Sequence, residues 1–294
     1  MGRTVLNTIQ TNGTLINSEW ADFFARNAFL VGISIDGPRD IHDKYRRDKG
    51  GAPTFDRVIK GIRTMHSAGV QYNTMSTINK ASEGRGLETY LFLKGLGTKY
   101  MQFMPVLEHV SRDSRRRIVD PKEEDSVTAP WSVSDTGFGK FMCEIFDYWV
   151  RKDVGTWFVG LFDATLANWC ALPPGTCVYA PVCGGNAVME HNGDIYPCDH
   201  FVYEKYLLGN IREHSIKDLM TGPAMVKFGI DKRNSLPRKC KQCQWLGACN
   251  GECPKHRFSA TESGETGLNA LCEGYRMFFS HAAPYMDYMK RLLE

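Results

Sequence analysis

The stretch that decides the second half of the fold is rich in cysteine and reads Cys240-Lys-Gln-Cys243-Gln-Trp-Leu-Gly-Ala-Cys249-Asn-Gly-Glu-Cys253. It belongs to a longer series, because eight of the ten cysteines of this 294-residue chain fall between positions 177 and 272. The other members of the series are Cys177, Cys183, Cys198 and Cys272. Eight thiols make two sets of four, and four thiolates either complete a tetrahedral zinc site or carry one four-iron cluster.

Spacing alone leaves the metal and the grouping open. Cys240 and Cys243 share one tight turn, and together with Cys249 and Cys253 they match a closed zinc ribbon. An iron–sulfur cluster accepts the same four thiolates. Disulfides would require export, whereas closely spaced cysteines in the cytosol indicate metal ligands.

Composition excludes several classes of protein. The formal net charge of +3 is small for this length and indicates neither a nucleic-acid partner nor a membrane surface. The sequence has no run of about 18 apolar residues, as a membrane span would need. The first residues lack the apolar core of a secretory signal, so we expect a cytoplasmic protein.

Short apolar strands alternate with helical segments ahead of the cysteine series. The predicted strands are residues 5–13, 29–36, 70–78 and 100–107, and the predicted helices between them are 18–25, 54–69 and 87–96. The alternation predicts an α/β fold of right-handed βαβ units around a parallel sheet, with the first strand buried. Four strands do not close an eight-stranded barrel, so the sheet is either open or missing its beginning. We expect Ser18 and Thr54 to cap their helices.

Later segments complete the predicted outline. Residues 112–125 are a charged run that predicts a solvated loop. A helix follows with an apolar face at Phe138, Phe141, Met142, Ile145 and Trp149, and residues 158–169 predict another helix. Pro173-Pro174-Gly175 then marks a boundary, which predicts two domains, 1–172 and 173–294.

Polar residues gather where the predicted strands end. In a parallel α/β fold the chemistry lies at the carboxyl ends of the strands. Those ends carry Gln10-Thr11-Asn12, Ser34-Ile35-Asp36, Asn79 and Leu107. They predict a site at this rim, although Asn and Asp also favour turns on their own account.

A hairpin over residues 188–196, with its turn at Asn192-Gly193, leads into Cys198 and Asp199. A carboxylate beside a thiolate-rich, partly dry centre tends to have a raised pKa, which suits a general base. The alternative is that Asp199 caps a turn. His191, His200 and His256 are interpreted as surface or supporting groups, because eight cysteines already complete two sites.

The chain resembles the anaerobic sulfatase-maturating enzymes, which are radical S-adenosylmethionine (SAM) proteins with a C-terminal SPASM domain. The resemblance is carried by residues 10–13, 32–38, 192–199, 208–211, 249–257 and 272–275, with Ile41-His42, Arg46 and Gln102-Phe103. It implies a partial (β/α) barrel of the radical SAM type, followed by an iron–sulfur SPASM domain. The implied activity is conversion of a sulfatase cysteine or serine to formylglycine.

The resemblance also implies how that reaction is divided. A 5′-deoxyadenosyl radical takes hydrogen from the target Cβ, a base removes the thiol or hydroxyl proton, and auxiliary clusters accept the remaining electron. The implied partners are a sulfatase polypeptide and an electron donor such as a flavodoxin or ferredoxin. Other radical SAM/SPASM enzymes mature different ribosomal peptides, and a non-catalytic metal-binding module that recognises a peptide would share the cysteine framework. These two alternatives stay open.

The resemblance assigns roles to particular residues. Two auxiliary [4Fe–4S] clusters would be held by two crossed sets of cysteines: Cys177, Cys183, Cys198 and Cys253, and Cys240, Cys243, Cys249 and Cys272. Asp199 falls on the base position of the family. Ser34, Arg46 and the backbone of Leu107 fall on positions that contact SAM, and Gln10, Thr11 and Asn12 would lie on the substrate side.

One departure from the family is large. The Cys-x3-Cys-x2-Cys motif that holds the radical cluster, and the Gly-Gly-Glu segment that contacts SAM, do not occur in the sequence. We therefore expect a chain that lacks its first two βα units, roughly 60–90 residues at about 30 or more each. Without ligands for the third [4Fe–4S] cluster, we expect no turnover from this chain alone.

Overall fold

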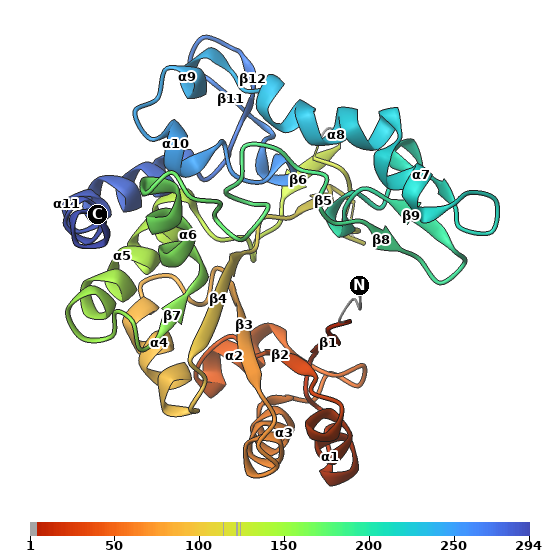
Figure 1. Cartoon of the computed structure of the whole chain (residues 1–294), viewed down its shortest axis with the longest axis vertical. Coiled ribbons are helices and arrows are strands. Elements are labelled where there is room, and N and C mark those ends of the chain that lie inside the picture. Colours follow the sequence, from red (N-terminus) through yellow and green to blue (C-terminus); the bar gives the residue numbers. More distant parts are fainter. Residues whose placement is uncertain (1–4, 114, 122, 124) are drawn as a thin grey trace. The chain divides into compact units, whose positions relative to one another are not determined.

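The structure is a computed structural model that describes residues 5–113, 115–121, 123 and 125–294. It divides into two compact units (Figure 1). The first runs to Asp163 and includes Ser280–Tyr285, and the second comprises Ala164–Phe279 and Met286–Glu294.

The first unit is built on a parallel sheet with the strand order β1-β2-β3-β4-β7 in the described residues. The strands are β1 (Thr8–Thr11), β2 (Leu30–Ser34), β3 (Tyr72–Ile78), β4 (Tyr100–Pro105) and β7 (Phe158–Val159). Every neighbouring pair is parallel, which confirms the α/β fold predicted from the alternation of strands and helices.

Helices link the strands, and Figure 1 shows α1, α3 and α4 together on one side of the sheet. The helices are α1 (Ser18–Arg26), α2 (Arg39–Tyr45), α3 (Phe55–Ser67), α4 (Gly86–Gly95), α5 (Asp135–Lys152) and α6 (Gly160–Trp169). The face of α5 predicted to be apolar is buried. A hairpin of β5 (His109–Ser111) and β6 (Ser126–Thr128) flanks the predicted charged loop, in which residues 114, 122 and 124 lie outside the described residues.

Three predicted details of this unit are wrong. Asn17, rather than Ser18, caps α1 by accepting a hydrogen bond from the Trp20 amide. Residues 158–159 form a strand, because the Phe158 amide bonds to Lys99 at the end of the neighbouring connection and its ring stacks on Tyr100. The segment before β1 is exposed rather than buried, because β1 is an edge strand that pairs only with β2 among the described strands.

The second unit combines small antiparallel sheets with helices. The hairpin predicted at residues 188–196 is present, with Gly193 at φ 93° in its turn. The strands are β8 (Val188–Met189), β9 (Asp194–Tyr196), β10 (Gly209–Asn210), β11 (Ser259–Ala260) and β12 (Thr266–Leu268). The helices are η1 (Asp199–Phe201), η2 (Glu204–Tyr206), α7 (Ile216–Thr221), α8 (Pro223–Asn234), α9 (Arg238–Lys241), α10 (Leu246–Cys249), η3 (Pro254–His256) and α11 (Cys272–Leu293).

A closed ring of hydrogen bonds joins the end of β2, α2 and the start of α3. The Asp36 amide donates to Nδ1 of buried His42, so Nε2 carries the ring proton and donates to Oγ1 of Thr54. The Thr54 hydroxyl donates to the Arg46 carbonyl, and the Arg46 guanidinium returns to the Asp36 carboxylate. Thr54 precedes α3 as predicted, but its side chain serves this ring, and Asp43 accepts the first helical amides instead.

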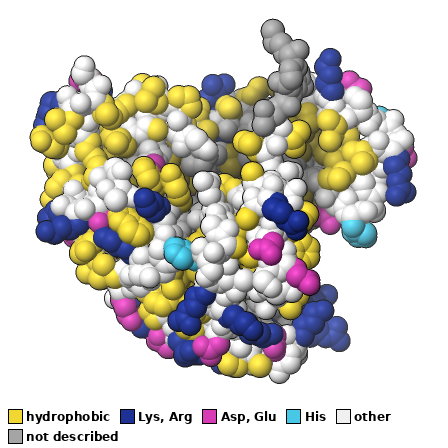
Figure 2. All heavy atoms as spheres, turned by 60° about the horizontal axis from the view of Figure 1, so that its bottom comes forward, with side chains coloured by type: hydrophobic (Ala, Val, Ile, Leu, Met, Phe, Trp, Pro, Cys, Tyr) yellow, Lys and Arg dark blue, Asp and Glu magenta, His cyan; other side chains and the backbone are white. Residues whose placement is uncertain are grey.

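Both signs of charge are intermixed on the face of the molecule seen in Figure 2. Ion pairs on the outer helices of the first unit include Arg39–Asp56, Arg57–Asp48 and Arg85–Glu88. Such solvated pairs contribute little to stability. Among the helices of the described residues, none combines the length and the apolar character needed to cross a bilayer.

The ring predicts a pH dependence of stability. Burial lowers the pKa of His42 to about 4 from its ordinary value of 6.5. As the pH falls from about 6.5 to about 4, His42 therefore binds a proton in the unfolded chain but stays neutral in the folded chain. Over this window the free energy of unfolding decreases by about 3 kcal/mol because of His42, at about 1.4 kcal/mol per pH unit.

Urea unfolding of His42→Gln between pH 7.5 and pH 4.5 measures this contribution. We expect the variant to be less stable at neutral pH but to lose less stability than the wild type on acidification. His66→Gln, on the exposed end of α3, is the matched control for introducing a glutamine. Equal pH dependence of His42→Gln and the wild type would show that His42 does not titrate as the ring requires.

Candidate functional site

The carboxyl ends of the parallel strands bring several predicted residues to one rim of the first unit. Ser34 ends β2, and its hydroxyl accepts a hydrogen bond of 3.1 Å from the amide nitrogen of Gln10 on β1. Thr11 and Asn12 lie beside them, where their side chains accept bonds from the Gly13 and Thr14 amides. Asn12 therefore both stabilises a turn and lies at the rim of the predicted site.

Arg46 is fixed at this rim by a buried carboxylate. Its Nε and Nη2 donate to the two oxygens of Asp36 at 2.7 and 2.9 Å. Asp36 also accepts from the Thr77 amide on β3 at 2.8 Å, and its side chain is 1% exposed. The bidentate pair holds the guanidinium in one orientation, and a quarter of the Arg46 side chain stays open to solvent.

A hollow of about 250 Å³ lies next to these groups, at the ends of β3 and β4. It is lined by Tyr45, Thr77, Asn79, Val106 and Trp131. Each of two SAM-assigned positions is the chain neighbour of a lining residue, since Arg46 follows Tyr45 and Leu107 follows Val106. Within the described residues no hydrogen bond engages the main-chain N–H or C=O of Leu107, which is buried. The hollow thus offers aromatic walls to a ligand, and the main chain of Leu107 lies one residue beyond its lining.

Sequence reasoning did not single out Tyr45 or Trp131 as lining residues. Trp131 reaches the rim because its carbonyl accepts a hydrogen bond from the Lys80 amide, which follows Asn79. This contact spans some fifty residues of the chain and has no signal in the local pattern.

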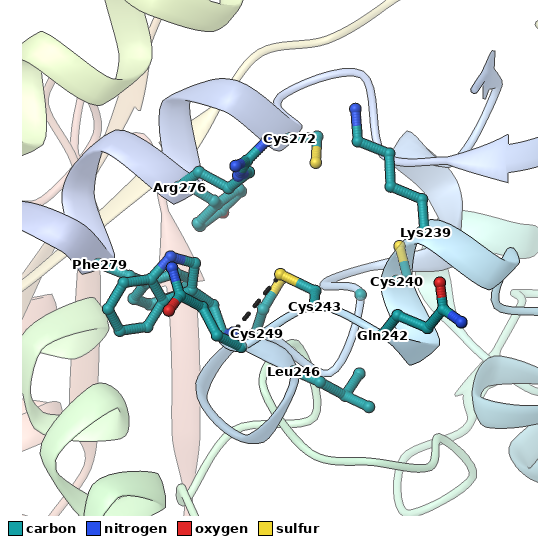
Figure 3. Close-up of a pocket in the computed structure, with 13 residues that line it drawn as sticks. Lys239, Cys240, Gln242, Cys243, Leu246, Cys249, Cys272, Arg276 and Phe279 are labelled. Atoms are coloured by element: carbon teal, nitrogen blue, oxygen red, sulfur yellow. Dashed lines mark hydrogen bonds between the residues drawn. The ribbon is translucent and has the colours of Figure 1, made fainter. Parts of the chain in front are cut away.

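In the second unit, Cys240, Cys243, Cys249 and Cys272 surround one hollow of about 380 Å³ (Figure 3). Cys240 lies in α9, Cys243 just after it, Cys249 at the end of α10 and Cys272 at the start of α11. Four thiolates around one hollow could hold either a zinc ion or a four-iron cluster. Among the described residues, no group of three or more His, Cys, Asp or Glu side chains converges as a single metal ion requires.

The remaining four thiols of the series form a second group. Cys253 interacts with Cys183 and Cys198, and Cys177 interacts with both of these. Cys253 therefore lies with the early cysteines, although Cys249 is its nearest neighbour in sequence. The eight thiols thus fall into two neighbourhoods, one with Cys177, Cys183, Cys198 and Cys253 and one with Cys240, Cys243, Cys249 and Cys272, and their roles as metal ligands stay a prediction.

Burial raises the pKa of most of these thiols. It reaches about 12 for Cys198 and Cys249 and about 11 for Cys272, and neighbouring thiols of the same set add to the rise. A buried thiol ionises readily only when a positive charge compensates it, as a metal centre does. These residues fit a cationic centre with several thiolate ligands.

The backbone conformation between Cys249 and Cys253 explains why these two cysteines lie near different thiols. Asn250, Gly251 and Glu252 all have left-handed backbones, with φ of 49°, 70° and 53°. We call these three residues the elbow. The left-handed conformation costs little for glycine but about 1–2 kcal/mol for other residues, so the elbow needs support from its surroundings.

Asp199 follows Cys198 directly and lies in η1. Its Oδ1 accepts a hydrogen bond of 3.2 Å from the Cys198 thiol, and its side chain is exposed. The neighbouring His200 places Nδ1 3.8 Å from the Cys253 sulfur. The carboxylate thus lies at the open side of one thiol set, within reach of a molecule that approaches from solvent.

Comparisons with known proteins agree with this arrangement. A family model described as the SPASM iron–sulfur cluster-binding domain matches residues 177–244, and the radical SAM superfamily model matches residues 3–93. The serine-type anaerobic sulfatase-maturating enzyme of Bacteroides thetaiotaomicron is 48% identical over 294 residues, which cover 99% of this chain and 71% of the relative. The cysteine-type enzyme of Clostridium novyi is 32% identical over 291 residues, covering 98% of this chain and 74% of that protein.

Solved structures give the same result. The native enzyme abbreviated anSMEcpe, with bound AdoMet and the Cp18Cys peptide, superposes with a TM-score of 0.85 at 28% identity, over 98% of this chain and 77% of that chain. SuiB of Streptococcus suis with bound S-adenosylmethionine is similar in fold alone, at 17% identity and a TM-score of 0.56 over 90% of this chain and 59% of that chain. The protein belongs to the family of anaerobic sulfatase-maturating enzymes, which are radical SAM enzymes with a SPASM iron–sulfur domain.

Proposed function

We propose that this chain takes part in converting a serine or cysteine of a sulfatase polypeptide to formylglycine. The observation that carries the proposal is the arrangement of eight cysteines in two crossed sets, with an exposed carboxylate on the first. Two auxiliary [4Fe–4S] clusters at these sets would supply a place for the electron that the oxidation releases. The sets are Cys177, Cys183, Cys198 and Cys253, and Cys240, Cys243, Cys249 and Cys272.

Asp199 is the proposed base. In the structure its carboxylate accepts a hydrogen bond from the Cys198 thiol. A cluster would be bound by Cys198 as a thiolate, without that proton, and the carboxylate would then have an open lone pair for the hydroxyl or thiol of the target residue. Its exposure lets a polypeptide substrate approach.

The rim of the first unit is the proposed SAM site. The Asp36 pair orients Arg46, the hydroxyl of Ser34 lies at the end of the adjacent strand, and the Leu107 backbone offers one donor and one acceptor. The hollow between Tyr45 and Trp131 would accept an aromatic ring. Gln10, Thr11 and Asn12 continue the rim and are proposed to face the substrate.

The sequence of 294 residues contains no Cys-x3-Cys-x2-Cys segment. We propose that these residues alone do not cleave SAM and that turnover requires such a segment in addition. An electron donor of the flavodoxin or ferredoxin type is the proposed source of electrons. The relative with 48% identity is of the serine type, so a serine target is the first to test.

Two other functions would use the same cysteine framework. One is maturation of a different ribosomal peptide, and the other is metal-dependent recognition of a peptide without catalysis. A chain fused to a segment with the radical-cluster motif, offered sulfatase-motif peptides with serine or cysteine, separates them. Formylglycine in either peptide supports the proposal, and the peptide that is converted shows the target residue, whereas unchanged peptides favour the alternatives.

Metal content gives the first prediction of the proposed function. Anaerobically purified protein should contain about eight irons with matching sulfide, because each set of four thiolates holds one four-iron cluster. The same preparation should not cleave SAM. Elemental analysis with a sulfide assay measures the content, and two zincs per chain would overturn the ligand assignment.

Asp199→Asn gives the second prediction. The amide cannot take a proton, so formylglycine formation by the fused enzyme should fall at least about 100-fold, within the usual contribution of a general base. Iron content should not change, since Asp199 is not a ligand. Asp231→Asn, which alters an exposed carboxylate paired with Lys227 in the same unit, is the matched control. Retained product formation in Asp199→Asn would assign the base to another group.

A further inference from the structure

Arg257 is a buried arginine that is hydrogen-bonded to the backbone of the elbow. Its Nε donates to the Gly251 carbonyl at 2.7 Å, and its Nη2 donates to the carbonyls of Asn250 and Glu252 at 2.8 and 3.1 Å. One guanidinium thus binds all three carbonyls of the left-handed run. Nη1 donates to the Lys232 carbonyl at 2.5 Å, which ties the elbow to α8. The planar fork of arginine fits this task, and a lysine cannot reproduce it.

The same guanidinium is near thiols of both sets. Its charge acts first on the buried carboxylate of Glu252, and also on Cys240 and Cys249 of the second set and Cys183 of the first. Burial lowers the pKa of Arg257, whose side chain is largely removed from water. A buried cation is stable when negative groups compensate it. Glu252 supplies one negative group, and ionised thiolates of both sets would add to it.

A second buried cation supports this view for the first set. Lys232 is 1% exposed, and its Nζ donates to the carbonyls of Cys177 and Val178 at 2.6 and 2.7 Å. Its charge acts on Cys183 and Cys253. The adjoining part of α8 is close to this set, because Gly229 leaves room where a Cβ would meet the Cys183 carbonyl at 2.5 Å. Positive charge is therefore built into the interior beside the thiols.

We propose that Arg257 positions Cys249 and Cys253 for different clusters and raises the reduction potential of both clusters through its shared charge. The inference rests on the proposed function, since it places an iron–sulfur cluster at each thiol set. Reduction adds negative charge to a cluster, so a cation nearby in a dry interior favours the reduced form. Arg257 acts through the ligands and the field, so it is a positioning residue rather than a catalytic one.

We call the hydrogen bonds from Arg257 to the elbow the clamp. Two substitutions separate the effect of the clamp from the effect of the Arg257 charge. Arg257→Met removes both and keeps an apolar side chain of suitable length, while Arg257→Lys keeps the charge and loses the fork. Redox titration followed by electron paramagnetic resonance measures the midpoint potential of each cluster. Hydrogen exchange of the protein as isolated measures how firmly residues 250–253 are held.

In Arg257→Met we expect both potentials to fall, with at least a tenfold change in each one-electron reduction equilibrium, about 59 mV. Arg257→Lys should show less than half of this shift. Exchange at residues 250–253 should accelerate at least tenfold in both variants. Lys241→Met, an exposed cation between Cys240 and Cys243, is the matched control and should leave both potentials unchanged, because solvent screens its charge.

Unchanged potentials in Arg257→Met, or a shift at one cluster only, would overturn the shared charge. Unchanged hydrogen exchange at residues 250–253 in both variants would overturn the clamp, and this readout remains even if Arg257→Met fails to hold iron. Iron analysis of the wild type keeps the two proposals apart. Zinc in place of iron refutes the clusters of the proposed function and with them the effect on potential, whereas the exchange data still test the clamp.

Discussion

The second unit depends on one local constraint, the left-handed elbow between Cys249 and Cys253. An elbow of three left-handed residues changes the direction of the chain between the two cysteines, and Cys249 and Cys253 lie near different thiols. A regular helical connection would place both cysteines on one face, one turn apart. The Arg257 bonds offset the backbone strain by giving each of the three elbow carbonyls a hydrogen-bond partner.

In the first unit the corresponding constraint is the orientation of the Arg46 side chain at the end of the sheet. A parallel sheet gathers the ends of its strands at one rim, but it does not fix the side chains there. The ring through Asp36, His42 and Thr54 does so, since each residue is hydrogen-bonded to the next and the last bond returns to Arg46. The two units thus each hold polar groups in a set geometry with a buried arginine contact, to a carboxylate in one and to carbonyls in the other.

The sequence predicted features with a regular period or a characteristic turn. The parallel sheet followed from apolar strands alternating with helices, and the hairpin before Cys198 followed from Asn192-Gly193. Features that depend on contacts distant in sequence were missed. Residues 158–159 are a strand only because β4 is beside them, and the burial of Lys232 and Arg257 contradicts the usual exposure of long cations. Spacing paired Cys253 with its sequence neighbours, whereas the electrostatic influence of Cys183 and Cys198 on it links positions more than fifty residues apart.

The central claim is that Cys249 and Cys253 bind different clusters, and single cysteine replacements test it most directly. Mössbauer spectra of Cys249→Ala, Cys253→Ala, Cys198→Ala and Cys272→Ala, each labelled with ⁵⁷Fe, show which cluster each variant loses or alters. The crossed arrangement predicts that Cys253→Ala matches Cys198→Ala and that Cys249→Ala matches Cys272→Ala. Loss of the same cluster in Cys249→Ala and Cys253→Ala would contradict it.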